Sequence, residues 1–256
     1  MPDAAVTACM YAIVVIFGMV VGSFLNVCIF RIPKEESIVF PNSHCMECGY
    51  KLRWYDLIPV FSFIMLGGRC RKCNTKLSLQ YPLIEGLNGA LYAIVFLANG
   101  WNLTSIVYCL LTSALIVISV IDFRTMTIPD GASIFIFILG IAAVVLDRSA
   151  WKDHVIGFFV VSGFLLIIFL VSVGRAMGFG DVKLMAAIGF VIGWKKVILG
   201  LVIGCIIGSV VHVIRMKLFK EGNELAFAPY LAIGSVVSVL VGDLLIDWYL
   251  RICGLM

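Results

Sequence analysis

Long apolar runs alternate with short polar or Gly/Pro-containing segments along most of the chain. Eight runs have the length and composition of membrane-spanning helices, at residues 5–30, 82–99, 102–121, 129–146, 154–174, 182–194, 196–214 and 228–249. The sixth run is short and contains glycine, so we expect a tilted or broken helix there, or one that fuses with the seventh. Runs such as 156–173 are apolar on every side, whereas strands of a membrane β-barrel alternate apolar and polar residues.

The composition agrees with this pattern. Of the 256 residues, 62% are hydrophobic and 13% are charged, while a soluble domain has about 45–50% apolar and 25% charged residues. The mean hydropathy is +1.10. These values exclude an ordinary soluble enzyme, a disordered chain and a nucleic-acid binder. The predicted fold class is an all-α polytopic membrane protein with about eight spans, surrounded by lipid.

The positions of the basic residues indicate how the chain is oriented. The first is Arg31, and eight of the 19 fall between Arg31 and Lys76. Basic segments stay on the cytoplasmic side, so this stretch is expected inside and the first helix runs inward. A cleaved signal peptide starts with positive charge, so residues 5–30 do not read as one. With eight spans, 14 basic residues lie inside and 5 outside.

One sizeable polar connection, residues 31–81, separates the first two runs. It contains two Cys-x-x-Cys pairs, Cys45 with Cys48 and Cys70 with Cys73, with 21 residues between the pairs. A segment this small buries too little apolar surface to fold alone, so it needs a metal or disulfides to stabilise it. Four cysteines in two such pairs suit a structural, tetrahedral zinc site. Two disulfides are the alternative, which the reducing cytoplasm disfavours. We therefore expect a first helix at 1–30, a zinc module at 31–81 and a helical membrane domain at 82–256.

Two aspartates stand at the ends of predicted spans. Asp122 ends the third span, and Asp181 follows Gly178-Phe179-Gly180 between the fifth and sixth. Ionisable groups in membrane segments are costly and point to function. Both aspartates are expected at cytoplasmic helix ends, where they can meet. The structural alternatives are an ion pair of Asp122 with Arg124 and helix capping by Asp181.

A pair of close carboxylates can carry out aspartyl-protease chemistry. Like charges held together share one proton, so one carboxylate activates water while its protonated partner polarises the scissile carbonyl. Other membrane acids have simpler interpretations. Asp243 and Asp247 are expected to lie in a solvated interfacial salt bridge with Arg251, one turn beyond Asp247. Glu85 either caps the second span or contributes to a ligand site. An ion relay in a transporter is the main competing function, although the acids gather at one face rather than at mid-membrane.

These residues resemble the bacterial type IV prepilin peptidase family, whose members act as leader peptidase and N-methyltransferase. The matching segments run in order from about residue 18 to 190. They are Gly22-Ser23-Phe24-Leu25-Asn26-Val27, Arg31-Ile32-Pro33, both cysteine pairs, Ile58-Pro59-Val60-Phe61-Ser62, Tyr81-Pro82-Leu83-Ile84-Glu85, Asp122, Ile128-Pro129-Asp130 and Gly178-Phe179-Gly180-Asp181-Val182-Lys183. Gly-x-Gly-Asp also occurs in presenilin-like proteases, but the inserted cysteine module distinguishes the two families.

The resemblance implies residue roles, substrates and cofactors. Asp122 and Asp181 correspond to the catalytic aspartates, and the four cysteines to a zinc set associated with methyl transfer. The implied substrates are prepilins and pseudopilins of pilus, secretion or competence systems. Their basic leader is cut at the cytoplasmic face, and the new N-terminus is methylated by S-adenosylmethionine. Gly68 matches a position linked to methyl transfer, and Gly68 and Glu85 are the candidate cofactor-binding residues. The implied location is the bacterial cytoplasmic (inner) membrane.

Overall fold

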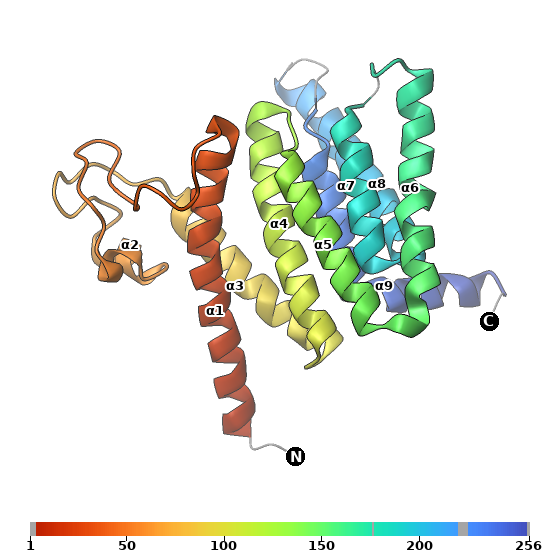
Figure 1. Ribbon diagram of the computed structural model, residues 1–256, viewed down its shortest axis with the longest axis horizontal. Helices are drawn as coiled ribbons and strands as arrows, with labels where there is room; N and C mark the ends of the chain where they lie inside the picture. The colour runs from red at the N-terminus through yellow and green to blue at the C-terminus, as the bar shows by residue number, and fades with distance from the viewer. Residues whose placement is uncertain (1–3, 176, 220–224, 255–256) are drawn as a thin grey trace. The chain divides into compact units, whose positions relative to one another are not determined.

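The computed structural model describes residues 4–175, 177–219 and 225–254, which are mainly helical (Figure 1). Within this described part there is no β-strand, only two isolated bridges. The chain divides into two compact units, Met1–Leu97 and Ala98–Met256. The expected all-α membrane fold is confirmed.

Every predicted apolar run forms a helix of its own in the described residues. The helices are α1 (Ala4–Arg31), α3 (Gln80–Asn99), α4 (Leu103–Thr125), α5 (Asp130–Leu146), α6 (Trp151–Val171), α7 (Phe179–Ile192), α8 (Trp194–Phe219) and α9 (Ala228–Ile252). Six described helices are long and apolar enough to cross a membrane. The other two, α5 and α7, have 17 and 14 residues, fewer than the roughly 20 that a span needs. The predicted eight spans are thus eight helices, of which six have spanning length.

The short sixth run is a separate helix that does not fuse with the next. α7 ends at Ile192, and Gly193 follows with a φ of 79°. Glycine adopts this left-handed backbone without steric penalty, which is why the helix stops there. α8 then starts directly at Trp194.

In the first unit, α1 and α3 pack closely through small and polar residues. A Cβ on Gly22 would lie 2.7 Å from the Cα of Glu85, so only glycine allows this approach. The Asn88 side-chain amide donates a hydrogen bond to the Gly18 carbonyl at 2.7 Å. The connection between these helices carries three short helices, η1 (Ile32–Lys34), η2 (Trp54–Leu57) and α2 (Phe61–Met65).

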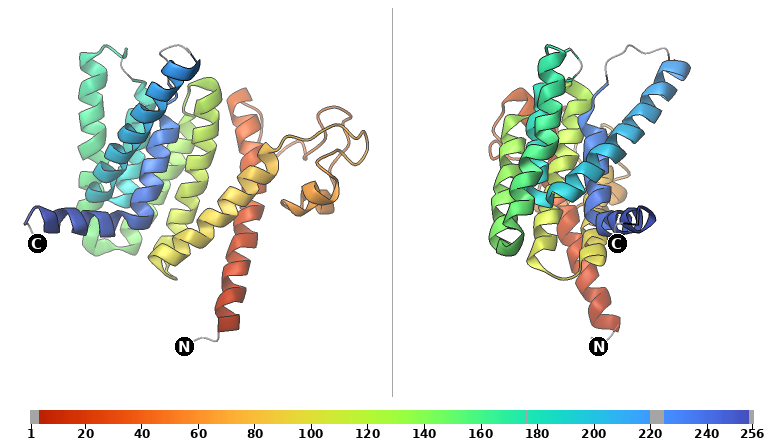
Figure 2. Two further views of the ribbon diagram at one scale, coloured as in Figure 1. Left: turned by 180° about the vertical axis from the view of Figure 1, so that it is seen from behind. Right: turned by 90° about the vertical axis from the view of Figure 1, so that its right-hand side faces the viewer.

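In the second unit, α4 packs against α5 and α9, α6 against α7, and α8 against α9 (Figure 2). Glycine pairs bring two of these helix pairs into backbone contact. A Cβ on Gly189 would lie 2.1 Å from the Gly157 carbonyl oxygen, and one on Gly234 would lie 2.1 Å from that of Gly200. Small residues are the usual means of close helix packing in membranes. The end of α4 and the starts of α7 and α9 lie at the same end of this bundle (Figure 1).

Candidate active site and metal centre

Asp122 and Asp181 line one cavity in the second unit. Asp122 lies in the last turn of α4 and Asp181 in the first turn of α7, with exposed fractions of 6% and 8%. The cavity has a volume of about 320 Å³. The two carboxylates are close enough to interact electrostatically. The cavity is also lined by residues of the α4–α5 turn, the start of α7 and the segment before α9, namely Met126, Thr127, Ile128, Gly178, Phe179, Gly180, Lys183, Leu225, Ala226 and Phe227.

The first residue of α9 holds the Asp122 carboxylate. The Ala228 backbone N–H donates to Asp122 Oδ2 at 3.1 Å. The first N–H groups of a helix have no partner within the helix, and the helix dipole favours negative charge there. Sequence reasoning missed this contact, because a backbone donor leaves no mark on residue type. Pro229, in the first turn of α9, signals the helix start but not what it faces.

Asp181 is not the N-cap residue of α7, but its carboxylate accepts a hydrogen bond from the backbone N–H of the N-cap residue, Gly178. α7 begins at Phe179 with Gly178 as its N-cap. Asp181 lies in the first turn with its backbone N–H bonded to the Gly178 carbonyl. Gly180 lies close to the α4–α5 turn, because a Cβ there would lie 3.2 Å from the Ile128 side chain, tighter than an ordinary contact. Gly180 therefore allows the α4–α5 turn to approach the start of α7.

Two other acids of this unit, Asp130 and Asp243, form ion pairs with lysines. Lys183 pairs with Asp130 and joins the starts of α7 and α5 at the edge of the cavity. Asp243 pairs with Lys196 at 2.8 Å, and its side chain is 78% exposed. The ion pair of Asp243 thus differs from the predicted salt bridge within α9, because its cation is Lys196 of α8 rather than Arg251.

The four module cysteines form a compact group of sulfur atoms. Their Sγ atoms all lie within 4.8 Å of one another. Cys45 and Cys73 are separated by 3.8 Å, and Cys48 and Cys70 by 4.0 Å. A tetrahedron of sulfurs around zinc, with Zn–S bonds of about 2.3 Å, has edges of about 3.8 Å. The group therefore fits a tetrahedral metal ion, and all four cysteines are free rather than paired as disulfides.

The two cysteine pairs lie on equivalent backbone turns. Gly49 and Asn74 follow the pairs with φ of 67° and 56°, and their N–H groups bond to the carbonyls of Cys45 and Cys70. Glycine and asparagine are the residues that tolerate this conformation best. Each turn thus directs two sulfurs to the same point.

The chemistry of the sulfurs also suits a cation. Backbone N–H groups of Cys73 and Lys72 lower the pKa of the Cys70 thiol to about 6. The Thr75 N–H favours the Cys73 thiolate, but burial and the neighbouring sulfurs raise the pKa of Cys73 to about 12. A bound divalent cation would favour the thiolate form of both Cys70 and Cys73, because thiolates are its ligands.

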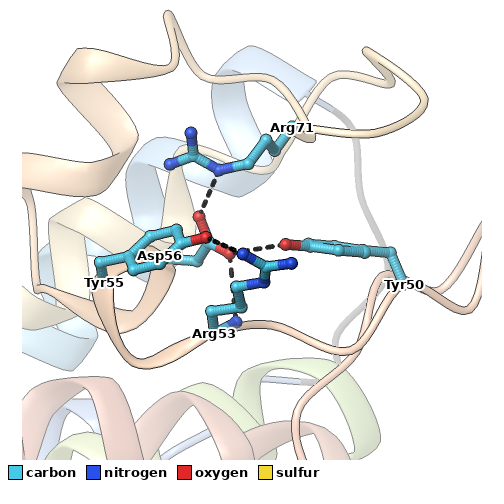
Figure 3. Close-up of polar contacts among 5 residues, drawn as sticks. All are labelled: Tyr50, Arg53, Tyr55, Asp56 and Arg71. Carbon is cyan, nitrogen blue, oxygen red and sulfur yellow. Dashed lines mark hydrogen bonds and ion pairs between the residues drawn. The ribbon is translucent and has the colours of Figure 1, made fainter.

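A polar network joins the second cysteine turn to the η2 segment (Figure 3). Asp56 accepts hydrogen bonds from Arg71 Nε at 2.7 Å, the Arg53 backbone N–H at 3.1 Å and the Tyr50 hydroxyl at 3.4 Å. The Arg71 guanidinium also lies over the Tyr55 ring, 5.0 Å from its centroid. The pairing of Arg71 with Asp56 depends on the path of the loop, so the sequence alone does not reveal it.

The two candidate cofactor residues both lie in the first unit. Gly68 follows α2 and adopts a φ of 67°. Glu85 is buried in α3, with 7% of its surface exposed, and its Oε2 accepts a hydrogen bond from the Val60 N–H at 2.7 Å. Because α3 begins at Gln80, Glu85 does not cap that helix. These features define a polytopic membrane protein with a candidate aspartyl-protease site and a separate metal-binding module.

Comparison with known proteins supplies the family. Residues 16–99 match the bacterial peptidase A24 N-terminal domain, and residues 109–213 match the type IV leader peptidase family. A Bacillus subtilis protein named prepilin leader peptidase/N-methyltransferase is 32% identical over 94% of this chain and 98% of its own length. A protein of the same name from Pseudomonas aeruginosa is 30% identical over 94% and 93% of the two chains. No solved structure matches the chain significantly.

The chain belongs to the type IV leader peptidase family, and it is a multi-pass bacterial membrane protein. The two family matches meet between residues 99 and 109, close to the boundary between the two structural units.

Proposed function

We propose that this enzyme removes the leader peptide from type IV prepilins and pseudopilins at the cytoplasmic face of the inner membrane, and then N-methylates the new amino terminus. Proteins named prepilin leader peptidase/N-methyltransferase match it over nearly their whole length. The observation that carries the cleavage reaction is the single cavity lined by Asp122 and Asp181.

In the proposed mechanism, the two aspartates act as a general base and a general acid. The ionised carboxylate takes a proton from water, which attacks the scissile carbonyl, and the protonated carboxylate donates a hydrogen bond to the carbonyl oxygen. The Ala228 N–H fixes the orientation of Asp122. Gly178 and Gly180 add no side chains to the cavity lining beside Asp181, which leaves room for an extended peptide to approach the carboxylates.

We assign zinc to the four-cysteine group and methyl transfer to the first unit. Cys45, Cys48, Cys70 and Cys73 would hold the ion with no open coordination position, so it would stabilise the module rather than react. S-adenosylmethionine would supply the methyl group. The match of residues 16–99 to a separate family domain supports two functional parts, with the peptidase site in the second.

A transporter that relays ions through its acids is the competing function. It predicts ionisable residues near the middle of the membrane. Asp122 and Asp181 instead lie at helix ends and share a cavity, which favours the peptidase.

The test is an assay of the purified full chain with a synthetic prepilin and methyl-labelled S-adenosylmethionine. Cleavage is followed by peptide mass, and methyl transfer by label on the mature peptide. We expect both, with label only on cleaved peptide. An intact prepilin after prolonged incubation with folded, zinc-containing enzyme would refute the proposed cleavage, and cleavage without label would refute the proposed methyl transfer.

A further inference from the structure

The turn before α2 holds a valine in a strained conformation. Val60 has φ 60° and ψ −48°, and the Phe61 N–H donates to the Pro59 carbonyl at 2.5 Å. This is a three-residue turn of the rare kind whose central residue has positive φ. A β-branched residue is especially unfavourable there. Such strain persists only where the surroundings hold it, and it clusters at functional sites.

Glu85 is the group that holds this turn. Its Oε2 accepts the Val60 N–H at 2.7 Å, and the Ser23 hydroxyl also hydrogen-bonds the carboxylate. Gly22 lies against the Glu85 Cα. The strained residue is therefore attached to the α1–α3 helix pair by a buried carboxylate.

Gly68 fixes the other end of α2. Its N–H donates to the Phe63 carbonyl at 2.8 Å, and its own carbonyl accepts the Leu77 N–H at 2.8 Å. A Cβ on Gly68 would lie 2.9 Å from the Phe63 ring, and φ is 67°. Gly68 thus connects the end of α2 with the segment that follows the second cysteine turn.

The two residues singled out as cofactor-binding candidates therefore converge on one short helix. We infer that Glu85 and Gly68 are positioning residues, which fix the beginning and the end of α2 between the helix pair and the cysteine module, and that methyl transfer depends on this placement rather than on contact of either residue with S-adenosylmethionine. The inference rests on the proposed methyl transfer by the first unit.

Three substitutions separate positioning from ligand binding. Glu85→Gln keeps a carbonyl acceptor for the Val60 N–H but removes the charge. Glu85→Met has similar size and removes the acceptor. Val60→Gly removes the strain, because glycine adopts positive φ freely. A positioning role requires only an acceptor for the N–H of residue 60, and the requirement is weaker once the strain is removed. A ligand or base role requires the carboxylate whatever stands at position 60.

Methyl transfer to a peptide supplied already cleaved is measured in the purified full chain, with kcat and KM for S-adenosylmethionine determined separately. We expect Glu85→Met to lower kcat about tenfold, Glu85→Gln to remain within about threefold of wild type, and KM to change by less than about twofold in both. Adding Val60→Gly to Glu85→Met should recover at least about a third of wild-type kcat. Zinc content and prepilin cleavage should be unaffected.

Opposite results would reject the inference. Equal loss of activity in Glu85→Gln and Glu85→Met, or a raised KM in Glu85→Gln, assigns the carboxylate to the ligand or the reaction. No recovery from Val60→Gly would reject relief of the strain at residue 60 as the role of Glu85. If Glu85→Met does not accumulate, Glu85→Gln decides alone through its KM. Gly68→Ala gives a second test: adding Phe63→Leu makes room for the new methyl group but leaves alanine strained at positive φ, so it should raise kcat only in part. A wild-type chain that transfers no label would instead refute the proposed function.

Discussion

At the scale of single residues, the clearest prediction concerns the two aspartates that line the cavity, Asp122 and Asp181. Asp122→Asn and Asp181→Asn keep the side-chain shape and remove the titratable proton. Each is expected to abolish prepilin cleavage, and the double variant should be no worse than either single one, because residues that act as a unit are non-additive. The measurement is the cleavage rate of a synthetic prepilin.

Asp243→Asn is the control for altering a membrane acid. Asp243 lies in an exposed ion pair with Lys196, away from the residues that line the cavity, and its variant should cleave at close to the wild-type rate. Both single cavity variants should still methylate a peptide supplied already cleaved, since we assign that reaction to the first unit. Substantial cleavage by either one would argue against the aspartyl mechanism.

Asp56 gives a second residue-scale prediction. Burial alone would raise its pKa, but hydrogen bonds from Arg71 and the Arg53 N–H outweigh burial and hold the pKa below its usual range. The carboxylate therefore stabilises the module at neutral pH, and this contribution is lost as the pH falls through the lowered pKa. Both oxygens of Asp56 accept hydrogen bonds, so in Asp56→Asn the side-chain NH₂ group would face a hydrogen-bond donor instead of accepting from it. We expect the free energy of module unfolding to fall by about 1–2 kcal/mol at neutral pH.

This loss is measured as faster limited proteolysis within residues 35–79 at a fixed free zinc concentration. Glu47→Gln is the matched control, because Glu47 is an exposed acid of the same module. Equal proteolysis rates in Asp56→Asn and Glu47→Gln would show that the network does not stabilise the module.

The site residues that could be predicted from the sequence are those recognised by the chemistry of their side chains. Two cysteine pairs and aspartates at the ends of apolar runs are visible without a fold. The Ala228 N–H could not be found in this way, since every residue but proline has one. The role of Asp56 could not be predicted either, because its ion pair with Arg71 depends on the path of the loop between them.

At the scale of elements, hydropathy located every long helix but not its ends. The third apolar run stops at Ile121, whereas α4 continues to Thr125 and is terminated by Met126 in the left-handed conformation. The apolar run ends where polar side chains begin, but backbone hydrogen bonding does not depend on polarity. Asp122 consequently belongs to the last helical turn, which gives it a fixed direction. The short helix α2 has no comparable signal, since five residues are too few for a periodic pattern.

The cysteine module carries the element-scale prediction. The purified protein should contain about one zinc ion per chain. Cys45→Ser and Cys73→Ser each remove one thiolate of the four and should abolish zinc retention. Because metal binding and folding are linked in small modules, residues 35–79 should then become sensitive to protease. Metal analysis and limited proteolysis are the measurements.

Cys109→Ser is the control for these variants. Cys109 is buried in α4, in the second unit, so its change should leave zinc content intact. Full zinc content in both module variants would eliminate the four-cysteine site. Prepilin cleavage should survive zinc loss, because the cavity acids belong to the other unit.

At the scale of the whole molecule, the division into two units agrees with two functions. The sequence predicted a separate module at 31–81, whereas the compact unit also includes α1 and most of α3. Polarity sets the module apart from its flanking helices, but Glu85 and Gly22 join α3, α1 and the α2 turn in one packed structure. Contacts of this kind cannot be obtained from hydropathy, which treats each run separately.

The orientation of the chain yields the last prediction. Eight of the 19 basic residues lie between Arg31 and Lys76, and such a concentration keeps a connection in the cytoplasm. α3 then runs outward and α4 returns inward, so the end of α4 that carries Asp122 is expected on the cytoplasmic side. Residues 34–78 should resist a protease added to intact cells and be cut in inverted membrane vesicles. Cleavage there in intact cells would reverse the orientation and place both aspartates on the side opposite to a cytoplasmic prepilin leader.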